Sequence, residues 1–216
     1  MITTDIIDVA HWEIGANIAE AARQGLKALW AKTGQGVDAP DPSFAAFRDA
    51  ARVAGILFGD YHFGTSVHSG VDQANDYIKR FDPSALHALD WETDPNHGTT
   101  MTLAQAEDFV TRVHEVTGRW PVLYSGLSFL FEHKIPATSP LGHCPLWLAC
   151  YGEEPKHMPS PWARWDLWQY TDFHDGPHDA ITYPRITQGL GRKVDRSAFR
   201  GDADALKAWW QTAGRC

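Results

Sequence analysis

Two carboxylates stand two positions apart in the segment DWE, at Asp90 and Glu92. Residues 85–92 predict a strand, and alternate residues of a strand share one face. Asp90 and Glu92 would therefore point the same way, with Trp91 opposite. Neighbouring carboxylates repel each other, so one keeps its proton to a higher pH than a lone carboxyl does. A glycosidase needs such a proton donor beside a second carboxylate, whereas a solvated strand end is the alternative for this spacing alone.

Two further acids fall in the first and last predicted strands. Asp8 lies within the β-branched run Ile6–Ala10, and Asp195 lies early in the strand expected over 194–199. The first and last strands of a closed barrel are neighbours, so these two acids would reach the same mouth as the DWE pair. A turn cap, or an ion pair with a lysine such as Lys32, is the alternative for Asp8.

Aromatic and amide side chains occur near the same predicted strand ends. Tyr and Trp rings can stack on sugar rings, although core packing is the more common role of any single aromatic residue. Acids surrounded by such rings are typical of a carbohydrate cleft. We expect substrate contacts from Tyr61, Phe63, Tyr124, Trp147, Tyr151 and Gln169.

The elements that must position these residues alternate along the chain. Five strand–helix units are followed by three strands with no helical pattern between them, which indicates an α/β fold with helices outside the sheet. Eight strands favour closure into a TIM-type barrel, shortened from the usual length of roughly 250 residues by the missing helices. In such barrels the site lies at the carboxyl ends of the strands. Strands are expected over 6–10, 26–34, 55–63, 85–92, 121–125, 145–151, 167–171 and 194–199.

The expected helices show recognisable end signals. Ser43 offers an N-cap for a helix that Gly55 stops, and Thr102 with Gln105 forms a capping box for a helix that ends near Gly118. Further helices are expected over 17–24, 70–81, 127–134 and 202–212.

Length and composition exclude several classes of protein. The chain has 216 residues, 44% of them hydrophobic, and a net charge of −8. One globular domain over residues 1–216 is expected, and an acidic domain is a poor candidate for nucleic-acid binding. No run approaches the roughly 18–20 apolar residues of a membrane span, and no signal peptide is evident at the N-terminus. The ten tryptophans fit either a large core or ligand-stacking surfaces.

The sequence contains no motif typical of a metalloenzyme or of a serine hydrolase. The 11 histidines include no H-E-x-x-H pair, and His174 and His178 fall in DFHDGPHDA, which is typical of a loop. No G-x-S-x-G surrounds Ser125 or any other serine. We therefore expect no metal and no cofactor, and a metal-dependent sugar deacetylase is kept as an alternative.

Eight segments in order resemble the glycoside hydrolase family 25 muramidases, the Chalaropsis-type lysozymes of bacteria, fungi and phages. Two positions depart from the family pattern: Gln35 replaces a glutamate, and Ser197 stands where an asparagine is usual. The segments are IDVAHW (7–12), AKTGQG (31–36), GDYHF (59–63), ALDWE (88–92), TGRWPVLYSG (117–126), PLWLACYG (145–152), LWQYTD (167–172) and VDRSAF (194–199).

The resemblance implies a (β/α)5β3 barrel that hydrolyses the β-1,4 bond between N-acetylmuramic acid and N-acetylglucosamine. By similarity, Glu92 is the general acid and Asp90 orients the substrate's 2-acetamido group as it attacks the anomeric carbon. Asp8 and Asp195 complete the acidic floor. No cofactor is implied.

The expected partner is the glycan strand of peptidoglycan, with no nucleic acid and no membrane insertion, and the protein is expected to be a monomer. It would act on the bacterial cell wall, after cytoplasmic synthesis with assisted release like a phage lysin, as a delivered effector, or as a processed secreted chain. A carbohydrate-binding protein that has lost activity on the same barrel is the main alternative, because two family positions are altered.

Overall fold

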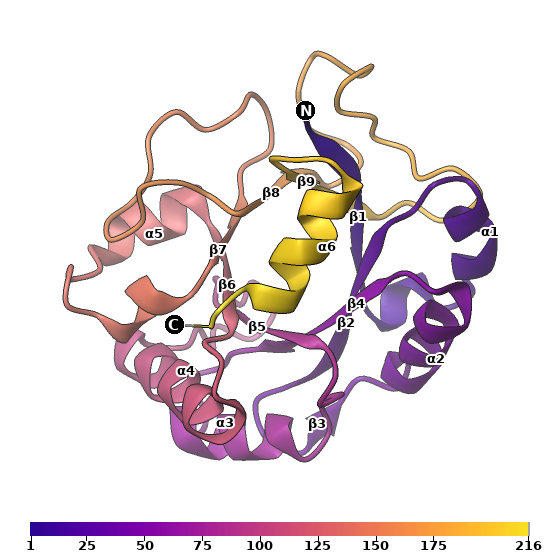
Figure 1. Cartoon of the computed structure of the whole chain (residues 1–216). Helices are drawn as coiled ribbons and strands as arrows, with labels where there is room; N and C mark the ends of the chain where they lie inside the picture. The colour runs from indigo at the N-terminus through magenta and orange to yellow at the C-terminus, as the bar shows by residue number, and fades with distance from the viewer. Residues whose placement is uncertain (216) are drawn as a thin grey trace.

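One sheet forms the centre of the molecule and closes on itself. The computed structural model describes residues 1–215. Its sheet has the order β1-β9-β8-β7-β6-β5-β4-β2-β3, and an additional β1–β2 pairing joins the two ends of the eight long strands into a barrel (Figure 1). The strands are β1 (Thr3–Val9), β2 (Ala28–Gln35), β3 (Ala39–Pro40), β4 (Leu57–Phe63), β5 (Leu86–Asp90), β6 (Val122–Gly126), β7 (Leu146–Ala149), β8 (Leu167–Thr171) and β9 (Asp195–Phe199).

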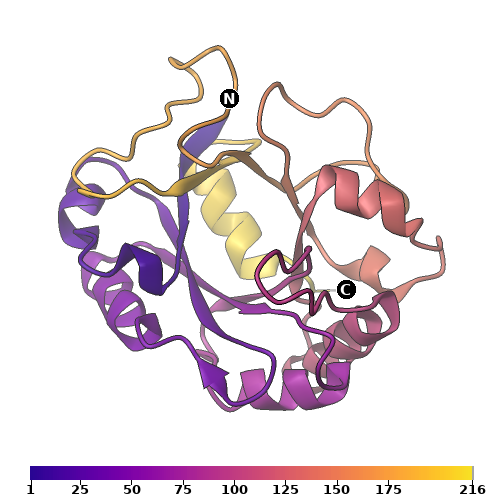
Figure 2. The same ribbon diagram turned by 180° about the vertical axis from the view of Figure 1, so that it is seen from behind.

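Helices surround the barrel on its outside, as seen from both directions in Figures 1 and 2. The closed barrel with outer helices confirms the α/β barrel expected from the alternation. The (β/α)5β3 label stays a prediction, because a two-residue β3 and a C-terminal helix are added to that pattern. The helices are η1 (His11–Glu13), α1 (Ile18–Arg23), α2 (Phe44–Ala54), α3 (Gly70–Ile78), α4 (Leu103–Thr117), α5 (Leu127–His133), η2 (Pro140–His143) and α6 (Ala203–Thr212).

Strand β9 runs against both of its neighbours, β1 and β8, whereas the other long strands pair in parallel. To add β9 in parallel, the chain would first have to cross to the opposite end of the barrel. The connection over 172–194 contains no helix and stays at one end of the barrel, so the chain re-enters the sheet from that end. The first residue of β9, Asp195, therefore lies beside the last residues of the parallel strands.

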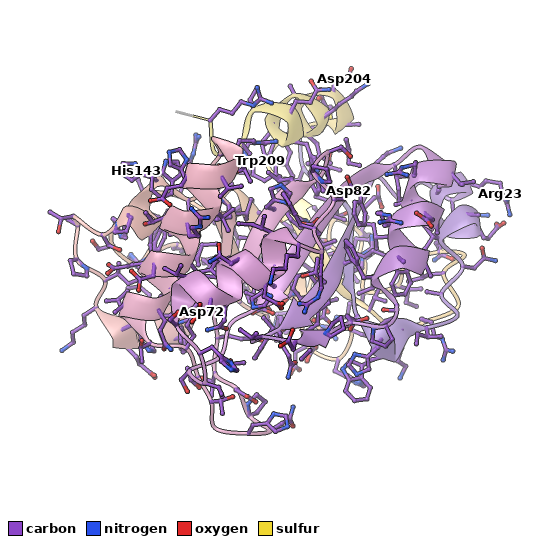
Figure 3. The ribbon with its side chains drawn as sticks, turned by 90° about the horizontal axis from the view of Figure 1, so that it is seen from below. Arg23, Asp72, Asp82, His143, Asp204 and Trp209 are labelled. Atoms are coloured by element: carbon purple, nitrogen blue, oxygen red, sulfur yellow. The ribbon has the colours of Figure 1, made fainter. Side chains whose placement is uncertain are left out.

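The last helix covers the other end of the barrel. Helix α6 places Leu206 and Trp210 against barrel residues such as Ile6 and Ala28, and the indole Nε1 of Trp210 donates to the carbonyl of Phe58 at 3.0 Å. Its outer side carries the exposed Asp204, which is labelled on the edge of the molecule in Figure 3. The barrel is therefore closed at the end that α6 covers and open at the opposite end.

Most of the tryptophans are buried in the core. Six of the ten tryptophans are buried, and inside the barrel Trp30 stacks on Trp147 with ring centroids 4.9 Å apart. Gly59 makes room for this pair, because a Cβ at that position would lie 2.4 Å from Cε3 of Trp30. Large aromatic rings therefore fill the interior of the barrel, as is usual for interiors packed to crystal-like density.

The helix ends test the capping predictions. Thr102 and Gln105 form the expected capping box, and Gly118 ends α4 at a φ of 69°. Gly55 likewise ends α2 at a φ of 69°. Ser43 is the N-cap of α2, as expected, although its hydroxyl donates to Asp41, at 2.5 Å, and makes no cap hydrogen bond to the helix.

Candidate active site

The four predicted acids line one cavity at the open end of the barrel. It has a volume of about 140 Å³, and its walls include Asp8, Asp90, Glu92 and Asp195. Asp8 in β1 is the direct register partner of Asp195 in β9, while Asp90 ends β5 and Glu92 follows it. The ends of three strands that are distant in sequence thus meet at one point.

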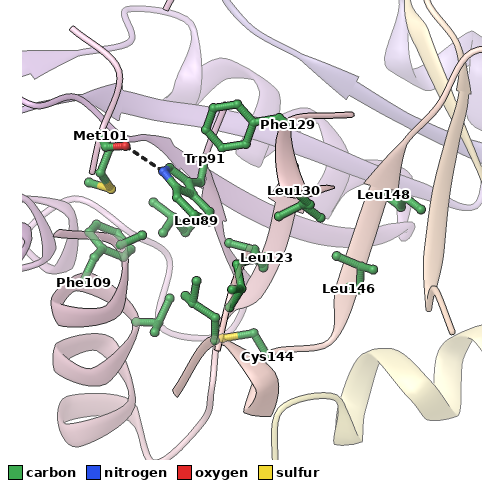
Figure 4. Packing of buried hydrophobic residues seen from close by; sticks show 14 of the residues in the cluster. Leu89, Trp91, Met101, Phe109, Leu123, Phe129, Leu130, Cys144, Leu146 and Leu148 are labelled. Carbon is green, nitrogen blue, oxygen red and sulfur yellow. Dashed lines mark hydrogen bonds between the residues drawn. The ribbon is translucent and has the colours of Figure 1, made fainter. Parts of the chain in front are cut away.

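The alternation expected in DWE is present. Asp90 and Glu92 face the cavity, whereas Trp91 is fully buried in the cluster outside the barrel. Figure 4 shows its indole among apolar side chains, with Nε1 donating to the carbonyl of Met101 at 2.8 Å. Because Trp91 is anchored on one face of the strand, the two carboxylates are held on the other.

Burial raises the pKa of both carboxyls in this pair. The pKa of Glu92 rises to about 7 because it is buried and lies close to Asp195, with Lys32 opposing the shift. The pKa of Asp90 rises well above its ordinary value, through burial and the neighbouring Glu92. Asp90 is only 7% exposed, and its Oδ1 has no hydrogen-bond partner. The pair can therefore hold a proton near neutral pH.

Asp8 and Asp195 are joined through the amide of Gln169. Its Nε2 donates to Oδ1 of Asp8 at 3.0 Å and lies 3.3 Å from Oδ2 of Asp195. Burial raises the pKa of Asp8 to about 7, with the Gln169 bond opposing and nearby acids, Glu13 first, adding to the shift. Burial and the neighbouring Asp8 raise the pKa of Asp195 to about 8. The alternative of an ion pair between Asp8 and Lys32 was wrong, because the Lys32 ammonium donates to Gln35 instead, at 2.9 Å.

Three of the five predicted aromatic residues line the cavity, and two do not. Tyr61, Tyr124 and Trp147 line the cavity with the four acids. Tyr151 lies at the edge, and its hydroxyl donates to Oε1 of Gln169 at 3.0 Å, as does that of Tyr124 at 2.8 Å. Phe63 is absent from the cavity walls, and the ammonium of Lys32 lies 4.9 Å from the centre of its ring.

The two departures from the family pattern both have partners here. Oε1 of Gln35 accepts the bond from Lys32. The hydroxyl of Ser197 accepts from Nε1 of Trp147 at 2.8 Å, and Ser197 is fully buried. The altered positions therefore support the site's aromatic wall and its nearby cation rather than leaving gaps.

A larger cleft of about 840 Å³ adjoins the small cavity. Glu92 and Tyr124 line both spaces, so the cleft and the cavity meet at these residues. Sequence reasoning missed most of the remaining lining, because it comes from loops and the short helix α5, where no periodic pattern marks a surface. These residues include Thr93, Ser128, Glu132, Asp175 and His178.

Lys32 is a further functional candidate that the sequence analysis treated only as a partner for Asp8. It lies in β2 with register partner Tyr61 in β4, and its charge lowers the pKa of both Asp90 and Glu92. Its signal in the sequence was a lysine directly after the apolar run 28–31 of the strand. Among residues 1–215, no group of three or more His, Cys, Asp or Glu side chains could hold a metal ion, and no helix is long and apolar enough to cross a membrane.

A barrel with paired, proton-holding carboxylates in an aromatic-lined cleft is the arrangement of a glycoside hydrolase. Comparison with known proteins agrees with this class. The family model for glycosyl hydrolases family 25 matches residues 7–177, and the chain belongs to that family.

Individual relatives match most of the chain. It is 27% identical to lysozyme M1 of Streptomyces globisporus, over 94% of this chain and 69% of that protein. It is also 27% identical to the N,O-diacetylmuramidase of Chalaropsis sp, over 79% of this chain and 89% of that one. The crystal structure of the bacterial lysozyme from Streptomyces coelicolor superposes with a TM-score of 0.79 at 27% identity, covering 95% and 96% of the two chains. The protein is an enzyme of the lysozyme and muramidase type, from a family that acts on peptidoglycan.

Proposed function

We propose that the protein is an N-acetylmuramidase, which cleaves the β-1,4 bond between N-acetylmuramic acid and N-acetylglucosamine. One observation carries this proposal: the buried pair of Asp90 and Glu92 has raised pKa values and faces a cavity that adjoins a larger cleft. A cleft of about 840 Å³ joined to the cavity has room for more than one sugar unit, and the pair lies where the two spaces meet.

Glu92 acts as the general acid. With a pKa of about 7 it is partly protonated at neutral pH, which suits proton donation to a leaving oxygen. It lines both the cleft and the small cavity. A sugar in the cavity and the next sugar in the cleft would therefore place their linking oxygen beside this carboxyl.

Asp90 positions the substrate's 2-acetamido group. Its unpartnered, buried Oδ1 is an acceptor that a substrate N–H can satisfy, since an unpaired buried acceptor costs about 1–3 kcal/mol. A bond donated to the carboxylate form lowers the pKa of Asp90 and leaves the shared proton on Glu92. The acetamido oxygen then attacks the anomeric carbon while the glycosidic bond breaks and Glu92 protonates the leaving oxygen. Water then attacks the anomeric carbon of the resulting ring intermediate and gives its proton to the Glu92 carboxylate, while the bond to the acetamido oxygen breaks. The configuration is therefore retained without a glycosyl-enzyme bond, an exception to the usual two-carboxylate scheme.

Asp8 and Asp195 stabilise the positive charge that develops on the sugar ring, because charges aimed into a low-dielectric site act strongly on a charged transition state. Tyr61, Tyr124 and Trp147 would contact the sugar at the cavity wall. Substrate contacts from Tyr151, Gln169 and Phe63 are proposed as well, and the hydroxyls of Tyr124 and Tyr151 both donate to Gln169.

The domain organisation, the oligomeric state, the partner and the route to the cell wall are also proposals. The chain acts as a single domain over residues 1–216, as a monomer, on peptidoglycan strands and without a metal or organic cofactor. It reaches the cell wall by assisted release or after processing of a secreted precursor. An inactive binding protein is disfavoured because all four acids are present and both altered family positions are hydrogen-bonded.

A digest of purified peptidoglycan tests the proposal. Products are identified by mass spectrometry before and after borohydride reduction, for wild type and Glu92→Gln, each with and without EDTA. We expect new reducing ends on muramic acid, absent from the variant and indifferent to EDTA. Glycan binding without cleavage would indicate the binding protein, and loss of acetyl groups blocked by EDTA would indicate a deacetylase. Near-normal cleavage by Glu92→Gln would contradict its role as the acid.

A further inference from the structure

A second cavity lies at the end of the barrel opposite the carboxylates. It has a volume of about 480 Å³ and is bordered by the first residues of β4, by the segment just before β5, and by the C-terminal end of α6. These are the starting ends of parallel strands, whereas the acidic cavity lies at their finishing ends. The two spaces are therefore separated by the packed interior of the barrel.

The charge of this second cavity contrasts with that of the whole chain, which carries a net −8. Four arginines line it against one aspartate, Asp82. The arginines come from three separate parts of the chain: helix α2, the loop before β6, and the segment after α6. They are Arg48, Arg52, Arg119 and Arg215.

The carboxylate of Asp82 already has hydrogen-bond and ion-pair partners. Oδ1 of Asp82 accepts from the backbone and hydroxyl of Ser84, at 2.9 and 2.6 Å, and Oδ2 lies 3.1 Å from Arg52. Burial alone would raise the pKa of Asp82, but the Ser84 bonds and the charges of Arg52 and Arg48 hold it below the ordinary value. Asp82 is thus an ionised anchor for Arg52, with little capacity left for the other three arginines.

Arg119 is held in place by backbone groups rather than by an acid. Its Nε and one terminal nitrogen donate to the carbonyl of Ala213, at 3.0 and 2.6 Å, and the same terminal nitrogen reaches the carbonyl of Trp210 at 3.1 Å. Burial and the nearby Arg215 lower the pKa of Arg119. Within residues 1–215, no aspartate or glutamate forms an ion pair with either arginine. Arg52 and Arg119 are therefore held beside an open space, and Arg48 and Arg215 add positive charge around it.

We propose that this second cavity binds a phosphate ester. Arginine forks suit phosphate and carboxylate oxygens. Donors that approach from three parts of the fold match the tetrahedral oxygens of a phosphate better than the two coplanar oxygens of a carboxylate. The apolar residues Leu57 and Phe58, also in the wall, give the carbon part of an ester a surface to contact. The site is separate from the proposed muramidase centre, so either assignment can fail without the other.

Calorimetric titration of the intact protein tests this site. The probes are inorganic phosphate, glycerol phosphate as a free monoester, a glycerol-phosphate polymer as a phosphodiester, and acetate as a carboxylate. We expect the phosphate probes to bind with dissociation constants of about 1 mM or below, at least roughly tenfold more tightly than acetate, and more weakly as salt is added. The tighter of the two glycerol probes identifies a free ester or a polymer as the source.

Two variants and one control locate the binding. Arg48→Gln removes a guanidinium group whose Nε donates to the exposed Asp49. Arg52→Gln removes the guanidinium group that pairs with Asp82. Each is expected to weaken phosphate binding about tenfold and to leave peptidoglycan cleavage unchanged. Arg23→Gln, on α1 and drawn far from the labelled Asp82 in Figure 3, is expected to change neither. Absence of phosphate binding, equal binding of acetate, or unchanged binding in both variants would each overturn the proposal.

Discussion

The side-chain nitrogen of Gln169 lies 3.0 Å from Oδ1 of Asp8, although 161 positions separate the two residues in the chain. The same nitrogen lies near Asp195, while the amide oxygen accepts from Tyr124 and Tyr151. A glutamine amide is both donor and acceptor. Gln169 therefore connects the acidic floor of the site to its aromatic wall, and it is only 1% exposed.

Replacing this amide should weaken catalysis without removing an acid. Gln169→Leu leaves two tyrosine hydroxyls without their acceptor and Asp8 without a donor, at about 1–3 kcal/mol per unpaired buried group. We expect kcat/KM for peptidoglycan to fall by roughly tenfold to a hundredfold. Turbidity clearing measures the rate, with the exposed Gln24→Leu as control. An unchanged kcat/KM would show that the bridge is dispensable.

The Asp90 carboxylate should act mainly on the chemical step. Asp90→Asn keeps the shape of the side chain but cannot accept an N–H bond as a full charge. We expect kcat to fall by roughly a hundredfold or more, with a much smaller change in KM. Steady-state kinetics on soluble glycan fragments separate the two constants, and the exposed Asp204→Asn serves as control. A change confined to KM would mean that Asp90 contributes only binding.

The activity should decline on the alkaline side of about pH 7, because Glu92 then loses the proton that it must donate. The charge of Lys32 lowers the pKa of Glu92, so its removal should raise that pKa. We therefore expect Lys32→Met to move the alkaline limb of the kcat/KM profile to higher pH, while the exposed Lys27→Met leaves it in place. A shift in the opposite direction would contradict the electrostatic role of Lys32.

The acidic floor should make the fold less stable as pH rises. The folded-state pKa of Asp195 is raised to about 8, so between its ordinary value and pH 8 the native state binds more protons than the unfolded state. Stability is then fully present at low pH and is lost as pH rises through the folded pKa. We expect Asp195→Asn to raise the free energy of unfolding at pH 8 by more than about 1 kcal/mol.

Urea unfolding at two pH values checks this sign. At pH 4 the gain from Asp195→Asn should nearly vanish, because the native carboxyl is protonated there. The exposed Asp204→Asn should show no such difference. An equal gain at both pH values would point to a packing effect instead of charge burial.

Ser197 should contribute to stability through one buried bond. Ser197→Ala removes the acceptor for Nε1 of Trp147 and leaves a buried donor unpaired, which costs about 1–3 kcal/mol. The control is Ser66→Ala, at an exposed position. Thermal unfolding measures both. A loss no larger than that of the control would mean that Trp147 finds another partner.

Local patterns predicted most of the elements because their causes are local. The eight long strands and the six α-helices fall within a few residues of the expected ranges, since β-branched runs, capping residues and stop glycines act over one or two turns. Ser43 is the N-cap that its type predicts, but the sequence did not predict that its hydroxyl would donate to Asp41 instead of accepting a bond from the helix. The two-residue β3 carried no pattern long enough to be recognised.

The sequence by itself determined the chemistry available: four acids near strand ends, aromatic neighbours, and alternation that puts Asp90 and Glu92 on one face. Only the tertiary structure decided how they act together. The antiparallel entry of β9 brings Asp195 to the mouth, the Gln169 bridge spans 161 positions, and raised pKa values follow from burial that no local pattern records. The physical reason is that side-chain direction is a property of neighbouring residues, whereas proximity, desolvation and the arginine-lined second cavity arise from segments that meet only when the barrel closes.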